Sequence, residues 1–269
     1  MIARQAKSAT LRAAETRAVL TSAINVARAL SRRERLARAR RAGLGSAGEV
    51  LGPLWPLLVY LPLVAGGALP RPEAISPLTY AALGYWTWSL LVDAALAPAR
   101  GLGTYRAPTV APVAAVLAGL LDAGRRTAVR TVILWPLAVI AAGGVDPLGS
   151  AWALAALGPA LALAGGIGLI LALWAAPWPD VPAGATTAAR LTLLPSLVLF
   201  PLPETAWAWA ATVLNPLAVF TDAARALALT GGMPQAGAVA AWSLIGAAAL
   251  TLGLRGFVRL KPRLHDALA

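Results

Sequence analysis

Two long stretches without a charged residue constrain this chain more than any other feature of its sequence. Residues 50–69 and 150–177 contain no Lys, Arg, Asp or Glu and are rich in Leu, Val and Ala. An α-helix crosses the ~30 Å hydrocarbon core of a bilayer in about 20 residues, and both stretches reach that length. Only 13% of the residues are charged and the mean hydropathy is +0.71, whereas soluble domains are about one quarter charged. The sequence therefore predicts an all-α integral membrane protein, because helices satisfy their own backbone polar groups in lipid.

Apolar segments between turn-rich Pro and Gly stretches predict six transmembrane helices. They are expected at 50–69, 78–97, 112–143, 151–176, 184–202 and 236–258. The third segment is too long for one simple crossing and carries charges, so its first half is expected in or near the cytoplasm. The chain is thus divided into a cytoplasmic interface helix with a basic linker, 1–49, and a six-helix transmembrane domain, 50–269.

The distribution of cations predicts the orientation of the chain. Residues 1–49 hold eleven of the 23 Lys and Arg residues, and most others fall in 98–126, 177–190 and 259–269. Cytoplasmic loops of membrane proteins carry such an excess, so both termini are expected in the cytoplasm. Because these cations flank apolar segments, the net charge of +12 indicates contact with membrane lipid and not with nucleic acid.

The N-terminal segment is expected to form an amphipathic helix that lies in the membrane interface. Between Ala9 and Leu36, apolar residues alternate with arginines at helical spacing, which would point the arginines toward lipid headgroups. The alternative is a basic arm whose only role is to fix topology. No uninterrupted apolar core precedes residue 42, so we do not expect a cleaved signal peptide.

A short helix with clear start and stop signals is predicted before the last span. Asn215 is a good N-cap, Pro216 suits the first helical position, and Gly231 with Gly232 would end the helix. About 15 residues give a length of about 22 Å, which is too short to span a bilayer.

A second short apolar segment, residues 201–214, precedes this helix and contains Trp207 and Trp209. Together the two segments predict a re-entrant helical hairpin in the outer leaflet. Irregular backbone at that depth must line a cavity, so Asp222 and Arg225, three residues apart, are expected to face its water-filled side. The alternative is a connector that lies flat on the surface.

Ionisable residues near membrane depth are functional candidates because an unpaired charge is costly there. The candidates are Asp93, Asp122, Arg125, Arg126 and Arg130. Asp122 lies one turn before Arg126 and could neutralise it, whereas Arg130 is the deepest and has no evident partner. Arg125 and Arg126 could instead be ordinary anchors that extend to headgroups.

Aromatic residues in the middle of the second span, Trp86 and Trp88, are not explained by an interfacial belt. Since aromatic faces suit the apolar side of pyranose rings, one of the pair is expected to line a channel.

The residues that several kinds of chemistry require are absent from this sequence. It has no cysteine and one histidine, His265, which excludes thiol chemistry and histidine-rich metal sites, and it has no GxxxxGKS or GxxxxGKT phosphate loop. We therefore predict no catalytic, cofactor or metal residues. An alternative, a membrane-embedded transferase for lipid-linked sugars, would need carboxylates. The outer segments offer only widely spaced ones: Glu73, Asp146, Glu204 and Asp222.

Four motifs in order give the chain a family resemblance. They are "RRERLARARRAGLGSAGEVLGPLWPLL", "GYWTWSLL", "NPLAVFTDAARALALTGGMP" and, after the final span, "GLRGFVRLKPRLHDALA". This order resembles the transmembrane subunit of ABC-2-type bacterial polysaccharide exporters, which handle capsule, O-antigen or teichoic acid. Where that family commonly has Arg-Asp, this chain has Pro179 and Asp180, so no role is assigned to that loop.

The resemblance implies a homodimer in the bacterial inner membrane that exports a lipid-linked acidic polysaccharide, capsular polysaccharide above all. Two copies of a separate ATPase subunit would bind ATP and Mg, and a periplasm-spanning export partner is also implied. An ABC-2 permease for another lipid or a drug is the alternative.

The resemblance also implies roles for particular residues. A cytoplasmic loop with Arg100, Tyr105 and Arg106 would dock on the ATPase. The short helices would form an outer gate, and the substrate path would include cationic and aromatic side chains. The implied gate residues are Trp207, Trp209, Asn215, Pro216, Asp222 and Arg225, and the implied path residues are Arg130, Arg126, Arg125, Asp122, Trp86 and Trp88.

Overall fold

The computed structural model describes residues 2–41, 51–72, 75–105, 110–144, 147–193, 196, 198–199, 201, 205–233 and 235–268. These residues are mostly helical and contain no strand, which confirms the all-α class. In chain order the helices are α1 (Ile2–Arg41), the 3-10 helix η1 (Gly52–Leu54), α3 (Trp55–Ala65), α4 (Pro77–Thr104), α5 (Pro112–Ala142), α6 (Pro147–Ala175), α7 (Val181–Leu191), α8 (Ala206–Leu214), α9 (Pro216–Thr230) and α10 (Ala236–Leu268).

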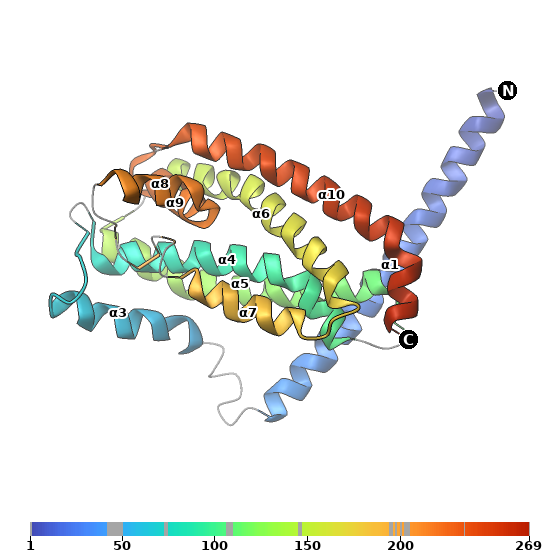
Figure 1. The fold of residues 1–269 in the computed structure, drawn as a ribbon, viewed down its shortest axis with the longest axis horizontal. Helices are drawn as coiled ribbons and strands as arrows, with labels where there is room; N and C mark the ends of the chain where they lie inside the picture. The colour runs from blue at the N-terminus through green and yellow to red at the C-terminus, as the bar shows by residue number, and fades with distance from the viewer. Residues whose placement is uncertain are drawn as a thin grey trace.

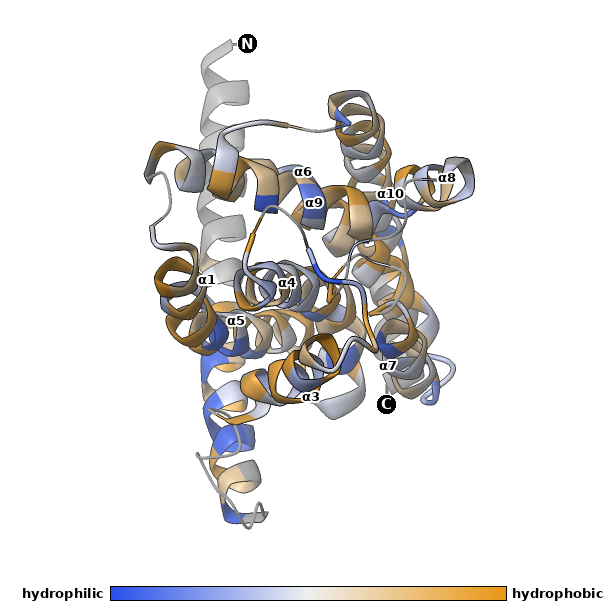
Figure 2. Cartoon of the chain, turned by 90° about the vertical axis from the view of Figure 1, so that its left-hand side faces the viewer, coloured by the Kyte–Doolittle hydropathy of each residue, from blue (hydrophilic) through white to orange (hydrophobic). Residues whose placement is uncertain are grey.

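Four long helices, α4, α5, α6 and α10, run side by side and form the body of the molecule (Figure 1). Helix α4 packs against α5, α6 and α9 and lies in the middle of the bundle when the molecule is viewed along its length (Figure 2). Two segments, Leu148–Ala175 and Ala236–Leu260, are long and apolar enough to cross a membrane. The structure thus supports a membrane protein in outline, and the number of spans stays a prediction.

Two of the six predicted spans do not form long continuous helices. Helix α3 and helix α7 have 11 residues each, or about 16 Å, about half the thickness of a hydrocarbon core. Helix α3 ends before Gly66 and Gly67, and Gly67 has a φ of +74°. Helix α7 ends at Leu191, four residues before Pro195, which cannot donate a hydrogen bond to the Leu191 carbonyl.

Glycines let α4 and α5 approach each other closely. A Cβ atom on Gly101 would lie 2.3 Å from the carbonyl oxygen of Ala115, and one on Gly119 would lie 2.2 Å from that of Ala97. Small residues permit such approach between helices in a membrane. The contact fixes the relative position of the charged residues that α4 and α5 carry.

Helix α1 crosses one end of the bundle at a steep angle and packs on α5 (Figures 1 and 2). Among the described side chains of α1, those of Ala23, Ala27 and Ser31 are buried, and their spacing of four residues places them on one face. Ile24 and Val26, two of the apolar residues between Ala9 and Leu36, are exposed. We call this end of the bundle the α1 end and the opposite end, where α8 and α9 lie, the α9 end.

The predicted short helix before the final long helix is confirmed as α9. The Asn215 side chain accepts a hydrogen bond from the backbone N–H of Leu217 at 3.1 Å, and Pro216 is the first helical residue. Gly231 ends the helix with a φ of +69°, which favours glycine. Helix α8 precedes it as a second short helix, as expected.

Candidate functional site

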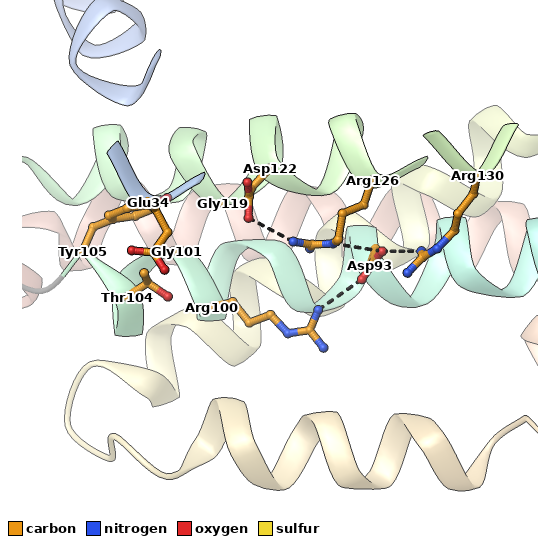
Figure 3. A pocket seen from close by; sticks show the side chains of 10 residues that line it. All are labelled: Glu34, Asp93, Arg100, Gly101, Thr104, Tyr105, Gly119, Asp122, Arg126 and Arg130. Atoms are coloured by element: carbon orange, nitrogen blue, oxygen red, sulfur yellow. Dashed lines mark hydrogen bonds and ion pairs between the residues drawn. The ribbon is translucent and has the colours of Figure 1, made fainter. Parts of the chain in front are cut away.

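A buried carboxylate on α4, that of Asp93, is the centre of an ion-pair network (Figure 3). Arg100 donates to Oδ1 at 3.1 Å, whereas Arg126 and Arg130 donate to Oδ2 at 3.3 and 2.5 Å. The Asp93 side chain is only 8% exposed. A buried charge is stable only with such compensation, so the three guanidinium groups hold Asp93 inside the bundle.

A second carboxylate, that of Asp122, extends this network along α5. Arg126 donates from Nη1 to Asp122 Oδ2 at 3.0 Å, which confirms the pairing predicted from their spacing of four residues. We call Asp93, Arg100, Asp122, Arg126 and Arg130 the Asp93 network. Its three arginines and two aspartates leave a net charge of +1 (3 − 2).

The position of Arg100 corrects one prediction. The sequence places it in a cytoplasmic loop, but α4 continues through Thr104, so Arg100 is helical and lies two turns after Asp93 on the same face. The helical position of Arg100 lets it pair with Asp93. Tyr105 ends α4, and Arg106 lies outside the described residues.

One cleft of about 460 Å³ lies beside the network, among α1, α4 and α5. Its lining includes Glu34, Asp93, Arg100, Thr104, Tyr105, Asp122, Arg126 and Arg130. The three acidic and three basic side chains balance in charge. This polar cleft is at the α1 end of the bundle, where Glu34 and Tyr105 approach the network (Figure 3).

Another cleft, of about 480 Å³, lies among α3, α4 and α7, and we call it the aromatic cleft. Trp55, Tyr85 and Trp88 supply aromatic surface, and Asp93, Arg100, Arg130 and Arg190 supply charge. Three arginines and one aspartate give a net charge of +2 (3 − 1). The cleft can therefore offer an anionic ligand both guanidinium donors and flat apolar surfaces. Arg130, Arg100 and Asp93 line both clefts.

The two central tryptophans have different surroundings. Trp88 lines the aromatic cleft, stacks on Tyr85 with ring centroids 5.8 Å apart, and donates from Nε1 to Thr192 Oγ1 at 3.1 Å. Trp86 donates to Thr131 Oγ1 at 2.7 Å and meets the edge of Trp135. Trp88 is therefore the member of the pair that is placed to contact a ligand.

Arg125 and the tryptophans of α8 lie away from these two clefts. Arg125 is half-buried and is absent from the described lining of both. Trp207 and Trp209 are more than 60% exposed at the α9 end. Such exposure suits an interfacial position.

A third cavity, of about 460 Å³, is almost entirely apolar and lies among α4, α6, α7 and α9. Leu91 and Leu96 of α4, Leu163 of α6 and Phe220 of α9 form much of its wall. We call it the apolar groove. No sequence pattern predicts this groove, because its walls come from four separate segments.

At the α9 end, Arg225 corrects the prediction that the Asp222–Arg225 pair faces a water-filled space. Arg225 is 4% exposed, and its guanidinium carbon lies 3.5 Å from the centre of the Tyr80 ring. Asp222 Oδ1 lies 3.8 Å from Arg225 Nη1 and remains half-buried. A cation held over an aromatic face is stabilised without water, which explains why Arg225 packs against α4.

The close packing around Arg225 affects both Gly84 and the pKa of Asp222. A Cβ on Gly84 would lie 2.3 Å from the Val198 carbonyl oxygen and 2.5 Å from Arg225 Nη2, so only glycine leaves room there. Burial raises the pKa of Asp222 above its ordinary value, and the Arg225 guanidinium partly opposes this shift.

Among the residues that the structure describes, no group of three or more His, Cys, Asp or Glu side chains could hold a metal ion. Comparisons with known proteins add no assignment. The sequence matches no protein-family model and no curated protein.

Proposed function

We propose that this chain is the membrane subunit of an ATP-driven ABC-2-type exporter of lipid-linked acidic polysaccharide in a bacterial inner membrane. It would act as a homodimer with two copies of a separate ATPase. The observation that carries this proposal is the aromatic cleft, where Arg100, Arg130 and Arg190 lie beside Trp55 and Trp88. The ordered sequence motifs described above support the same proposal.

The chemistry of the aromatic cleft suits an acidic glycan. Guanidinium groups bind carboxylate and phosphate through paired hydrogen bonds, and aromatic faces can stack on sugar rings. Asp93 already occupies part of the donor capacity of Arg100 and Arg130. An acidic substrate would therefore compete with Asp93 for these donors. Its binding would be reversible, as transport requires.

The arrangement of the helices supports a transport path that involves both ends of the bundle. In the proposed topology the α1 end is cytoplasmic, and α8 and α9 form a re-entrant hairpin that gates the outer end. Helices α3 and α7 would each form part of one of the six spans. Burial of Arg225 against Tyr80 would hold this gate closed.

A second candidate is an ABC-2 permease for a lipid that carries no polysaccharide. The apolar groove favours it, because an acyl chain needs a surface with few polar groups. Both candidates need an ATPase partner, and they differ in the molecule that is carried.

Mild extraction of the full chain from its native membrane tests this proposal. We expect an ATPase to co-purify and mass spectrometry of the complex to identify a lipid-linked acidic glycan. A lipid without a glycan would favour the second candidate. Turnover of a lipid-linked sugar by the purified chain without an ATPase would contradict both and indicate a transferase.

A further inference from the structure

Helix α7 separates the aromatic cleft from the apolar groove. Thr186, Ala189 and Arg190 line the cleft, whereas Ala185, Ala188 and Ala189 line the groove. Each set follows the spacing of three and four residues that places side chains on one helical face. The two faces adjoin at Ala189, so α7 presents a cationic side to one cavity and a small apolar side to the other.

The two cavities also share residues of α4. Val92 and Leu96 line both of them, as does Ala189 of α7. The cationic and apolar cavities are therefore neighbours on either side of one seam between α4 and α7. A molecule with an anionic end and an apolar chain could occupy both cavities at once.

Helix α7 packs against α4 along this seam. None of its residues is buried. Two side-chain hydrogen bonds cross the seam: Arg100 Nη2 donates to Thr186 Oγ1 at 3.2 Å, and Trp88 Nε1 donates to Thr192 Oγ1 at 3.1 Å. Both donors line the aromatic cleft. An anion that binds Arg100 competes with Thr186 and thereby weakens the closure of the seam.

We propose that the aromatic cleft and the apolar groove form a single site for a membrane lipid whose phosphate headgroup carries a net negative charge. The phosphate binds Arg100, Arg130 and Arg190, and an acyl chain passes between α4 and α7 into the groove. The net charge of +2 in the cleft and the apolar lining of the groove match the two ends of such a lipid. This inference rests on the proposed function, and it identifies the lipid end of the substrate as the part that this site binds.

Photo-crosslinking with two matched lipid probes tests the site. The full chain is placed in phosphatidylcholine nanodiscs with a trace of phosphatidic acid that carries a photoreactive group on its acyl chain, and in parallel with phosphatidylcholine that carries the same group. We expect the phosphatidic acid probe to label peptides of α6, α7 and α9 about tenfold more than the phosphatidylcholine probe. A factor of ten corresponds to one charge-assisted hydrogen bond.

Three variants separate the headgroup from the chain. Arg190→Gln should lower phosphatidic acid labelling about tenfold, because it removes one cation of the cleft, and should leave phosphatidylcholine labelling unchanged. Ala185→Trp fills the groove and should suppress labelling there. Ala183→Trp is the matched control: Ala183 is exposed on the same helix and is absent from the described lining of either cavity, so this variant should label normally.

Equal labelling by both probes, labelling confined to the outer face of α10, or crosslinks between two copies through the groove would each overturn the inference. The assay contains no ATPase and no polysaccharide. Failure of labelling would therefore contradict the lipid site and leave the proposed function standing. Failure of an ATPase to co-purify would contradict the proposed function and, with it, the assignment of the bound lipid to an exported substrate.

Discussion

At the scale of single residues, the Asp93 carboxylate is the centre of the charged part of the candidate site. It compensates three guanidinium groups whose side chains are 19 to 31% exposed, and no other described side chain pairs with all three. A group with this many charged partners affects stability as well as ligand binding.

Asp93→Asn keeps the size of the side chain and removes its charge. We expect the free energy of unfolding to fall by about 3 kcal/mol, because the arginines keep their charge in partly buried positions. Chemical unfolding of the full chain in detergent measures the change. The control is Arg33→Gln on the exposed side of α1, which should change stability by less than about 0.5 kcal/mol. Equal stability of Asp93→Asn and the natural chain would show that the network does not hold the fold.

Asp222 predicts a pH dependence at the α9 end. Its pKa is raised in the folded chain, so the fold disfavours its charged form, and stability falls as pH rises from the unfolded value of about 3.9 through the folded value. Asp222→Asn should therefore be more stable than the natural chain at pH 7, and the difference should shrink as pH falls toward 4. Thermal unfolding at a series of pH values measures it. A variant less stable at pH 7 would indicate that attraction to Arg225 outweighs burial.

At the scale of helices, the sequence predicts boundaries well where a local signal exists. Asn215, Pro216 and Gly231 define α9 because caps act through neighbouring backbone groups. The sequence could not predict that Arg225 is also buried: the 3.6-residue period places it apart from the apolar stripe of α9, but its guanidinium group packs on the Tyr80 ring of α4.

Close contacts between helices give a prediction with an internal control. Gly84→Ala should destabilise the chain by about 1 to 3 kcal/mol, because the new methyl group would meet the Val198 carbonyl and Arg225. A Cβ atom on Gly124 of α5 would meet nothing within 4 Å. Gly124→Ala should therefore stabilise the chain by about 0.5 to 1 kcal/mol, because alanine has a higher helix propensity than glycine. Unfolding of both variants in the same detergent compares them. Similar effects of the two would contradict the packing of α9 on α4.

At the scale of the whole molecule, the all-α class and four long helices follow from the apolar segments, and the Asp122–Arg126 pair follows from local spacing. The meeting of Asp93 with Arg126 and Arg130 does not, because it depends on the approach of α4 to α5 at Gly101 and Gly119. The aromatic cleft likewise joins Trp55, Trp88 and Arg190 from three helices. Sequence patterns identify these residues as candidates, but they do not predict that the residues meet, because that depends on how separate helices pack.

The most direct test of the account is surface glycan in cells that depend on Arg130 variants. Arg130 lines both charged clefts and binds Asp93, so Arg130→Ala should abolish surface glycan and leave polymer inside the cell. Arg130→Lys keeps the charge but loses the paired donors, and should retain part of the export. Membrane levels of each variant are measured by immunoblot. Normal surface glycan with Arg130→Ala at an unchanged membrane level would contradict the account.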